Sequence, residues 1–413
     1  MNLQQQYEQI KARGLSLDMS RGKPGADVIS LADAMLQLPG EGNFTAANGL
    51  DCRNYGVLDG LPEAKELLAP IHGISPENII VGGNSSLQMM YDAVARAMLL
   101  GVGEKDCCPW AATFATGDAP KFLCPVPGYD RHFAICEALG IEMINIATDS
   151  NGPDMDAVEK AVAADENIKG MWAVPMYANP SGITYSDETV RRLATMKVAA
   201  KDFRLFWDNA YAVHHLGNSP DKHDKLANIL DECTKAGNPD RVYMFASTSK
   251  IAHPGAGLAI MGASANNAAW VREQMSFQTI GSDKLNQLRH VSFFKDFAGI
   301  QSHMAKIQEV LKPKFSAVLE ILEQELGTSG EFGSWHKPNG GYFISFEGKR
   351  GTAKRTVQLC KDAGVILTDA GATYPYGNDP DDANIRIAPT FPPLAELKEA
   401  MEVFCVSVKL ANM

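Results

Sequence analysis

Short apolar segments alternate with longer stretches of helical periodicity through the middle of the chain. The apolar segments cover residues 79–81, 122–126, 141–146, 171–176, 203–207, 242–245 and 258–261. Strands that are apolar on both faces and separated by helices are typical of a mostly parallel sheet that helices cover on both sides. The pattern therefore predicts an α/β domain with a mostly parallel, seven-stranded sheet.

The pattern changes after Met275. Apolar positions recur at helical spacing within residues 293–326, which predicts one long helix. Beyond it we expect a small α+β domain, whose predicted strands are 341–346, 365–367 and 385–387 and whose predicted helices are 354–363 and one that begins near Pro393.

The first fifty residues contain one short helical stretch followed by many Gly, Asp and Pro residues, and they do not form a domain alone. We expect residues 1–48 to pack with the small domain, residues 49–298 to form the large domain, and residues 299–413 to form the small domain.

Composition narrows the class of protein. Of the 413 residues, 45% are hydrophobic and 21% are charged, which is typical of a soluble globular enzyme. The net charge of −11 disfavours nucleic acid or an anionic membrane as the main partner, so an anion would need a local site.

The eight cysteines form no CxxC pair and no Cys/His cluster, which favours reduced thiols over a metal site. The first residues are polar, and no apolar run reaches the roughly 18 residues that a membrane helix needs. We therefore expect a cytoplasmic protein with no membrane association.

Polar motifs follow three predicted strands at their carboxyl ends, where open α/β sheets bind ligands. They are residues 179–182 (NPSG), 208–211 (DNAY) and 247–250 (STSK). An aspartate at such a strand end is partly desolvated, and a neighbouring lysine could pair with it or act as an amine nucleophile. A buried Asp208–Lys250 ion pair is the purely structural alternative. Each motif alone could be an ordinary turn, but their order and strand context together point to a site.

With the glycine-rich residues 254–257 (PGAG), these motifs make the chain resemble fold type I, class I pyridoxal-phosphate (PLP) aminotransferases. It most resembles the bacterial aspartate aminotransferase subgroup whose lysine motif is SxSKxxxxGAG. The resemblance implies a fold type I PLP-dependent transferase in which Lys250 forms a Schiff base with PLP and moves protons. It also implies that Asp208 pairs with the ring nitrogen and that Tyr211 and Asn179 hydrogen-bond the phenolic oxygen of the ring.

A phosphate site is expected where the strand 79–81 leads into a predicted helix at 87–100. The residues Gly83, Asn84 and Ser85 lie there, and a helix N-terminus offers free N–H groups to an anion. An ordinary strand-to-helix turn is the alternative. The resemblance implies three further phosphate ligands, namely Ser247, Ser249 and Tyr55. Tyr55 would reach the phosphate of the neighbouring subunit, so the resemblance also implies a homodimer that shares its active sites.

One departure from the family concerns the phosphate. Many relatives carry an arginine eight residues after the lysine, and Leu258 occupies that position here. Backbone amides and hydroxyls would then bear more of the phosphate charge. His253 could compensate, although a lone histidine in such a loop is often a structural donor.

Substrate carboxylates need cations. Arg386 matches the family's arginine that binds the α-carboxylate, and a solvent-facing strand arginine is the alternative. Gly22 matches a glycine whose backbone approaches that carboxylate, and Tyr129 matches the aromatic residue that stacks on the cofactor. For the distal carboxylate of a dicarboxylic substrate we favour Arg131 over Lys23 and Arg289, although Arg131 could equally lie on a helix surface.

The favoured function is an aminotransferase that uses PLP, an amino acid and a 2-oxo acid, with L-aspartate and 2-oxoglutarate as the preferred pair giving oxaloacetate and L-glutamate. The alternatives on the same fold are an aromatic, branched-chain or broad aminotransferase, a decarboxylase, or a lyase. A PLP-sensing regulator would need a DNA-binding domain, and only about twenty residues precede Ser20.

Overall fold

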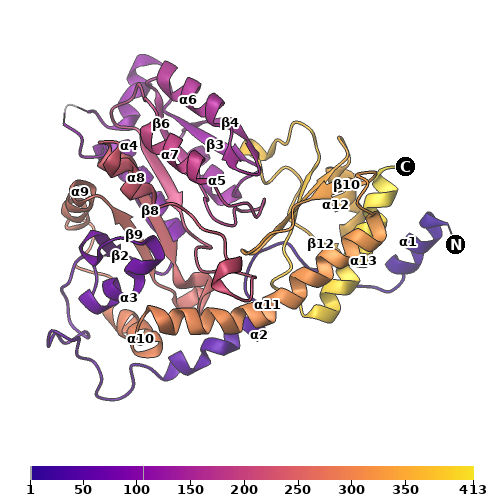
Figure 1. Cartoon of the computed structure of the whole chain (residues 1–413), viewed down its shortest axis with the longest axis horizontal. Helices are drawn as coiled ribbons and strands as arrows, with labels where there is room; N and C mark the ends of the chain where they lie inside the picture. Colours follow the sequence, from indigo (N-terminus) through magenta and orange to yellow (C-terminus); the bar gives the residue numbers. More distant parts are fainter. Residues whose placement is uncertain (1, 106) are drawn as a thin grey trace.

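The central sheet confirms the predicted α/β class. The computed structural model describes residues 2–105 and 107–413 (Figure 1). Its main sheet has eight strands in the order β2-β9-β8-β7-β6-β3-β4-β5. They are β2 (Ile79–Val81), β3 (Lys121–Val126), β4 (Glu142–Asp149), β5 (Gly152–Pro153), β6 (Ile168–Ala173), β7 (Arg204–Asp208), β8 (Val242–Ser247) and β9 (Ala259–Ala263).

The neighbouring strands from β8 to β4 run parallel, whereas β9 and β5 are antiparallel to their neighbours. All seven predicted strands are present, and the two-residue β5, which pairs with the end of β4, adds an eighth. The sheet is therefore mostly parallel, as the apolar runs predict.

Helices cover both faces of this sheet, and the alternation of side chains along a strand explains why. In β7, Phe206 packs into one apolar cluster, while Leu205 and Trp207 pack into another on the opposite face. The first cluster includes residues of α4 (Ser86–Leu100), α5 (Asp130–Ala138) and α9 (Ala265–Met275). The second includes residues of α6 (Met155–Ala164), α7 (Asp187–Thr195) and α8 (Ile229–Lys235).

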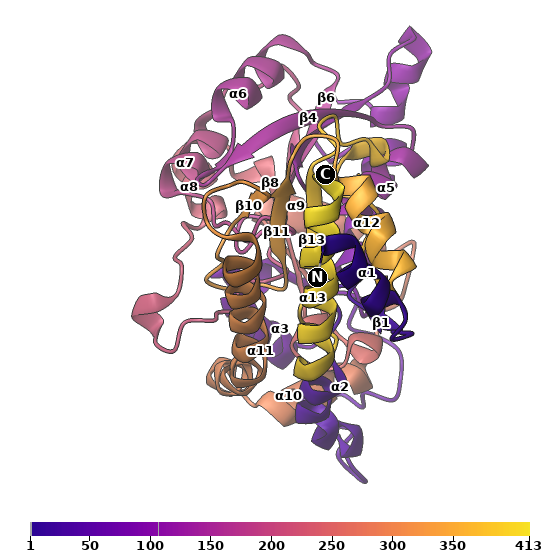
Figure 2. The same cartoon turned by 90° about the vertical axis from the view of Figure 1, so that its right-hand side faces the viewer.

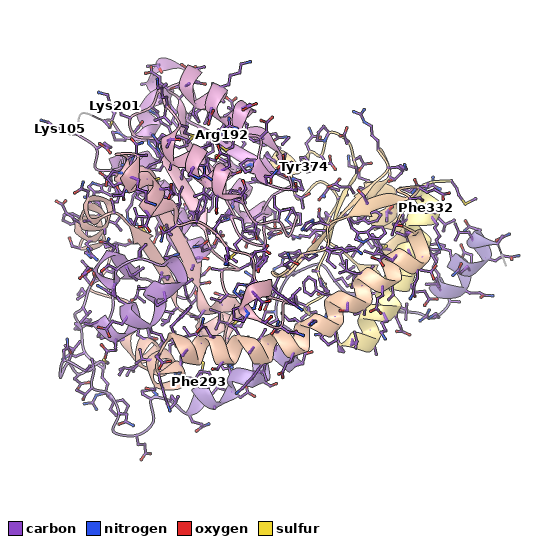
Figure 3. The ribbon with its side chains drawn as sticks, in the orientation of Figure 1. Lys105, Arg192, Lys201, Phe293, Phe332 and Tyr374 are labelled. Carbon is purple, nitrogen blue, oxygen red and sulfur yellow. The ribbon has the colours of Figure 1, made fainter. Side chains whose placement is uncertain are left out.

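The C-terminal part packs its own small sheet against three helices (Figure 2). The sheet has the order β10-β11-β13 and is antiparallel, with β10 (Gly333–Trp335), β11 (Ile344–Gly348) and β13 (Asn384–Ile387). The helices are α11 (Phe297–Leu326), α12 (Ala353–Asp362) and α13 (Leu394–Ala411). In Figure 3, the labelled Phe293 and Phe332 flank the two ends of α11, which joins the two parts of the chain.

The N-terminal segment lies against the C-terminal part. Helix α1 (Leu3–Lys11) lies beside α13 in both views, and the Tyr7 hydroxyl donates to the Leu359 carbonyl at 2.8 Å (Figures 1 and 2). Strand β1 (Leu17–Asp18) pairs in parallel with β12 (Val365–Ile366). Helix α2 (Ala26–Ile29) contacts α11. These contacts join α1, β1 and α2 to the C-terminal part, and the division into residues 1–48, 49–298 and 299–413 stays a prediction.

Three predicted extents are wrong, and backbone geometry explains each of them. The strand expected at 171–176 is β6, which begins earlier and ends at Ala173, because Pro175 has no N–H to donate to a ladder. The helix expected from residue 293 is two helices, α10 (Lys284–Phe294) and α11. Lys295, at φ 66°, breaks the helical backbone between them, and Asp296 then caps α11 by accepting from the Gly299 N–H at 2.8 Å.

The strand expected at 341–346 also begins late, because Gly341 has φ 85° and β11 starts only at Ile344. Within residues 2–105 and 107–413, no helix has the length and apolarity needed to cross a membrane. In the same residues, His, Cys, Asp and Glu side chains form no group of three or more that could hold a metal ion.

Candidate active site

A cavity of about 490 Å³ lies where the carboxyl ends of the main strands face the C-terminal part. Its walls bring together segments that are far apart in the sequence, from the N-terminal segment to β13. Seven residues proposed from the sequence line it, namely Gly22, Tyr129, Arg131, Asn179, Tyr211, Lys250 and Arg386. The cavity therefore gathers the proposed substrate ligands with Lys250, whereas Asp208 and the proposed phosphate ligands are not part of its lining.

Asp208, the last residue of β7, is 2% exposed and pairs with a histidine. Its Oδ2 lies 3.1 Å from His132 Nε2, and the His132 ring stacks on Trp172 with centroids 4.3 Å apart and an interplanar angle of 10°. Asp208 Oδ1 is buried and has no hydrogen-bond partner within the described residues. The carboxylate is thus fixed through one oxygen, and the other can accept a further donor.

Lys250 follows β8 in the short 3₁₀ turn Thr248–Lys250. Its Nζ lies 5.0 Å from the Tyr211 ring centroid, and it makes no ion pair with a carboxylate in the described part of the chain. The alternative of a direct Asp208–Lys250 ion pair is therefore not formed. Burial lowers the pKa of Lys250, and the Arg386 charge lowers it further, against an opposing effect of Asp208. A larger share of the amine is neutral than for an exposed lysine.

Two tyrosines beside this amine hold their protons. Burial raises the pKa of Tyr211 well above its usual range, with Tyr129 and Asp208 adding to the effect. Burial also raises the pKa of Tyr129 to about 12, with Asp208 and Asp130 as further causes. Both hydroxyls are therefore hydrogen-bond donors at neutral pH.

Arg386 on β13 reaches the cavity with its guanidinium held on several sides. Its Nη1 donates to Asp130 Oδ1 at 2.9 Å and to Asn179 Oδ1 at 3.3 Å, and Nη2 donates to Thr368 Oγ1 at 3.2 Å. The guanidinium lies 5.0 Å from the Phe343 ring centroid. Arg386 is 6% exposed, so the alternative of a solvent-facing strand arginine is wrong. A permanently charged planar fork in this position suits a carboxylate.

The expected phosphate loop lies against the lysine loop. Ser85 caps α4 by accepting from the Leu87 N–H at 3.2 Å, and Ser249 Oγ donates to the Asn84 carbonyl at 3.0 Å. Ser247 Oγ donates to Ser249 Oγ at 3.0 Å. A Cβ at Gly257 would lie 2.9 Å from the Asn84 carbonyl oxygen, so only glycine allows this approach. The two predicted groups of phosphate ligands are therefore neighbours, although they do not line the cavity itself.

Leu258, at the position where many relatives carry a phosphate-binding arginine, is buried in the apolar core. Leu258 is 2% exposed and packs in the large apolar cluster, and its backbone N–H donates to Thr248 Oγ1 at 2.8 Å. His253 Nε2 lies 3.5 Å from Asp33 Oδ1, and His253 does not line the cavity. Compensation by His253 stays a prediction.

The remaining predicted residues lie in different places. Arg131 is half exposed with its Nε 3.9 Å from Asp130 Oδ2, and Lys23 also lines the cavity. Arg289 does not, because its guanidinium donates to the Leu38 carbonyl at 3.0 Å and to Asn286 Oδ1 at 3.1 Å. Tyr55 is 79% exposed and lies away from the cavity within one chain.

Sequence reasoning missed four polar residues at this site: Arg21, Asp130, His132 and Thr368. Arg21, Asp130 and Thr368 line the cavity, and His132 supports Asp208. Their signal was present, because Asp130 and His132 follow the strand 121–126 and Thr368 follows the strand 365–366 at carboxyl ends. The same rule that selected Asp208 and Lys250 would have found these three residues, whereas no sequence signal points to Arg21.

Comparisons with known proteins agree with this architecture. A family profile described as "Aspartate amino-transferase" matches residues 1–413. An aspartate aminotransferase of Corynebacterium glutamicum is 42% identical over 410 residues, covering 99% of this chain and 93% of that protein. A protein of Mycolicibacterium smegmatis with a provisional aminotransferase name is 48% identical over 410 residues, covering 99% of this chain and 94% of that protein.

Solved structures show the same fold. The crystal structure of an aspartate transaminase from Corynebacterium glutamicum superimposes with a TM-score of 0.94 at 42% identity, covering 99% of this chain and 94% of that one. The α-aminoadipate aminotransferase LysN of Thermus thermophilus superimposes with a TM-score of 0.77 at 18% identity, covering 97% and 95% of the two chains. The likeness therefore extends over nearly the whole chain.

Proposed function

Because the chain belongs to the aspartate aminotransferase family, we propose that it transfers an amino group between L-aspartate and 2-oxoglutarate by means of PLP. The observation that carries the proposal is one cavity lined by an amine of lowered pKa and a buried arginine. Beside it, the strand next to the one that leads to Lys250 ends in the buried carboxylate of Asp208, which has one oxygen without a partner in the described residues. The choice of aspartate is supported by the name of the 42% identical relative.

The residues present fit PLP. Asp208 Oδ1 is a buried acceptor without a partner in the described residues, which suits the protonated nitrogen of a pyridine ring. The N-terminus of α4, which Ser85 caps, lies against the loop that carries Ser247 and Ser249, and the N–H groups of a helix N-terminus suit a phosphate. Lys250 supplies an amine for the aldehyde.

When bound, PLP supplies an electron sink for the negative charge that develops at the substrate Cα. Lys250 Nζ would then take the proton from the substrate Cα and return it to the carbon that was the aldehyde of the cofactor, which completes a 1,3-proton shift. Asp208 would keep a proton at the ring nitrogen, and His132, which contacts the other carboxylate oxygen, would keep the carboxylate oriented. The Tyr211 hydroxyl and the Asn179 amide would donate to the phenolic oxygen, and the Tyr129 ring would pack against the cofactor.

Arg386 is proposed to bind the substrate α-carboxylate, with the backbone at Gly22 nearby. A side chain at Gly22 would collide with the Phe343 ring, so only glycine lets the N-terminal segment lie this close to Phe343. Orientation by a bidentate guanidinium holds the Cα–H bond in a fixed direction, which is the requirement for selective proton removal.

Arg386→Lys is expected to lower kcat/KM for aspartate by about 10–10²-fold, because an ammonium keeps the charge and loses the bidentate fork. Steady-state kinetics would measure this. Arg192→Lys, which changes an arginine paired with Glu159 and Asp156 away from the cavity, is the matched control. Equal losses in the two variants would contradict a role for Arg386 in substrate binding.

The distal carboxylate requires a second cation, and Arg131 stays our proposed ligand. Arg21 and Lys23 line the same cavity, and Lys23 is 3.8 Å from Asp18. No sequence motif singled out Arg21, yet its exposed position at the cavity makes it the alternative to Arg131.

Arg131→Ala is expected to raise KM for aspartate by about tenfold while leaving KM for alanine within about twofold, because only aspartate carries the second carboxylate. Kinetics with both amino acids on Arg131→Ala and Arg21→Ala would measure it. A selective loss in Arg21→Ala alone would assign the distal carboxylate to Arg21. A loss for both amino acids would contradict the assignment.

The decisive test of the proposed function is the half reaction. The purified PLP-loaded protein is mixed with each amino acid in turn, and conversion of PLP to pyridoxamine phosphate is followed by visible absorbance and chromatography. Aspartate or glutamate should give complete conversion, together with the matching 2-oxo acid. No conversion with either would overturn the assignment.

We further propose a homodimer in which Tyr55 reaches the phosphate of the neighbouring subunit. Support comes from large apolar side chains that are exposed on the monomer near this loop, since Phe277 is 82% exposed and Ile280 is 62% exposed. Residues 52–56 and 280–285 line one cavity of about 460 Å³.

The eight cysteines are free thiols, which agrees with the proposed cytoplasmic location.

A further inference from the structure

The segment of residues 20–24, here named the strap, forms one wall of the substrate cavity. Ser20, Arg21, Gly22 and Lys23 all line it. The strap has no helix or strand of its own, so other parts of the chain must hold its backbone in place.

Hydrogen bonds from the C-terminal part hold the strap at both ends. The Thr368 hydroxyl donates to the Ser20 carbonyl, and the same oxygen atom of Thr368 accepts from Arg386. At the other end, Thr390 Oγ1 donates to the Lys23 carbonyl at 3.0 Å. The second anchor depends on the position of Thr390.

The Lys314 ammonium holds Thr390, the residue that forms the second anchor, in its position. This lysine of α11 is 2% exposed, and its Nζ lies 2.8 Å from Asp27 Oδ2 and donates to the Thr390 carbonyl at 3.1 Å. Asp27 belongs to α2, which follows directly after the strap. One buried ammonium therefore joins α2 to residue 390 across the end of the strap.

The two sides that Lys314 joins are in close contact. A Cβ at Gly25 would lie 2.6 Å from the Phe391 carbonyl oxygen, and Lys23 Nζ lies 3.8 Å from the Phe391 ring centroid. Removing the ammonium would leave a buried carbonyl without its donor and a carboxylate without its counterion at this contact. The contact would open, and the strap would lose its fixed position.

We propose that Lys314 is a positioning residue that holds the strap against the substrate cavity and thereby sets the affinity for the amino acid, an inference that rests on the proposed aminotransferase reaction. The Lys314 ammonium bonds to Asp27 and to the Thr390 carbonyl, and neither belongs to the proposed cofactor site. We therefore expect PLP binding to be independent of these two contacts of Lys314.

The first measurement does not depend on activity. Trypsin can cut the strap after Arg21, whereas Lys23 is followed by Pro24 and resists cleavage. In the PLP-loaded protein, Lys314→Met is expected to accelerate cleavage at Arg21 by about tenfold, as measured by mass spectrometry of the N-terminal fragment. Asp27→Asn, a milder change at a half-exposed carboxylate, should accelerate it in the same direction if Lys314→Met does not fold.

The second measurement is kinetic. Lys314→Met and Asp27→Asn are expected to raise KM for aspartate by about tenfold while changing kcat by less than about threefold and leaving the PLP dissociation constant unchanged. Lys314→Arg, which keeps the charge, should recover part of the loss. The control is Lys169→Met, which breaks another ion pair of a largely buried lysine, with Asp202 at 2.9 Å, near the opposite ends of the main strands.

Unchanged cleavage at Arg21 in both Lys314→Met and Asp27→Asn would overturn the proposal, and so would equal acceleration in Lys169→Met. A loss confined to kcat, or weaker PLP binding, would also overturn it. If the unaltered protein transaminates no amino acid, the proposed function fails, and cleavage at Arg21 still decides whether Lys314 holds the strap.

Discussion

Replacing Lys250 by alanine is expected to lower the rate of transamination by a factor at the upper end of the roughly 10²–10⁴-fold range that is typical for loss of a general acid–base group. The reason is that Lys250 has two roles in the proposed reaction, as the amine that bonds to PLP and as the group that moves the Cα proton. Its burial and lowered pKa suit both roles, because a neutral amine is the reactive form.

Two measurements check this expectation. Steady-state assays give the loss of rate, and borohydride reduction followed by mass spectrometry shows whether PLP is bonded to residue 250. Lys250→Ala should bind PLP without a reducible bond, whereas Lys222→Ala, at an exposed lysine in a surface turn, should behave as the unaltered protein. Substantial turnover by Lys250→Ala would remove Lys250 from the mechanism.

Asp208→Asn is the second change with a large expected effect, a loss of about 10²–10³-fold in kcat. Asparagine keeps the shape of the side chain and removes the negative charge that holds a proton at the ring nitrogen. Without that proton the ring stabilises charge at Cα poorly. Asp208 is buried and held by His132, so its charge acts in a poorly solvated place where its loss has a large effect.

The effect of the Asp208 charge on the reaction can be tested separately from any effect of the substitution on protein stability. PLP methylated at the ring nitrogen carries a permanent positive charge, so it should restore part of the activity of Asp208→Ala, which leaves room for the methyl group. Asp202→Asn is the matched control, because Asp202 is also buried and paired, with Lys169, yet it precedes β7, whereas Asp208 lies at the carboxyl end of that strand. A fall of kcat in Asp202→Asn equal to that in Asp208→Asn would assign the effect to lost stability.

The apolar strands and the polar residues at strand ends were predictable because both depend on local sequence. Apolar runs such as 203–207 end in a polar residue where the strand leaves the sheet, and parallel strands bring all such ends to one edge. That is why the sequence pattern alone could group Asp208, Lys250 and Asn179. Element boundaries were less predictable, because Lys295 and Pro175 interrupt regular structure without changing the apolar pattern.

By itself, the sequence determined the α/β class, the apolar strands along the chain and the chemical groups available at the carboxyl edge of the sheet. The tertiary structure decided which of these groups meet. His132 lies 76 residues before Asp208 and pairs with it, while Lys250 and Asp208 remain apart. Arg386 reaches Asp130 across 256 residues, and Lys314 joins α2 to residue 390 at the end of the strap. Such contacts are set by how strands, helices and loops far apart in the sequence pack together, and no periodicity within a single segment contains that information.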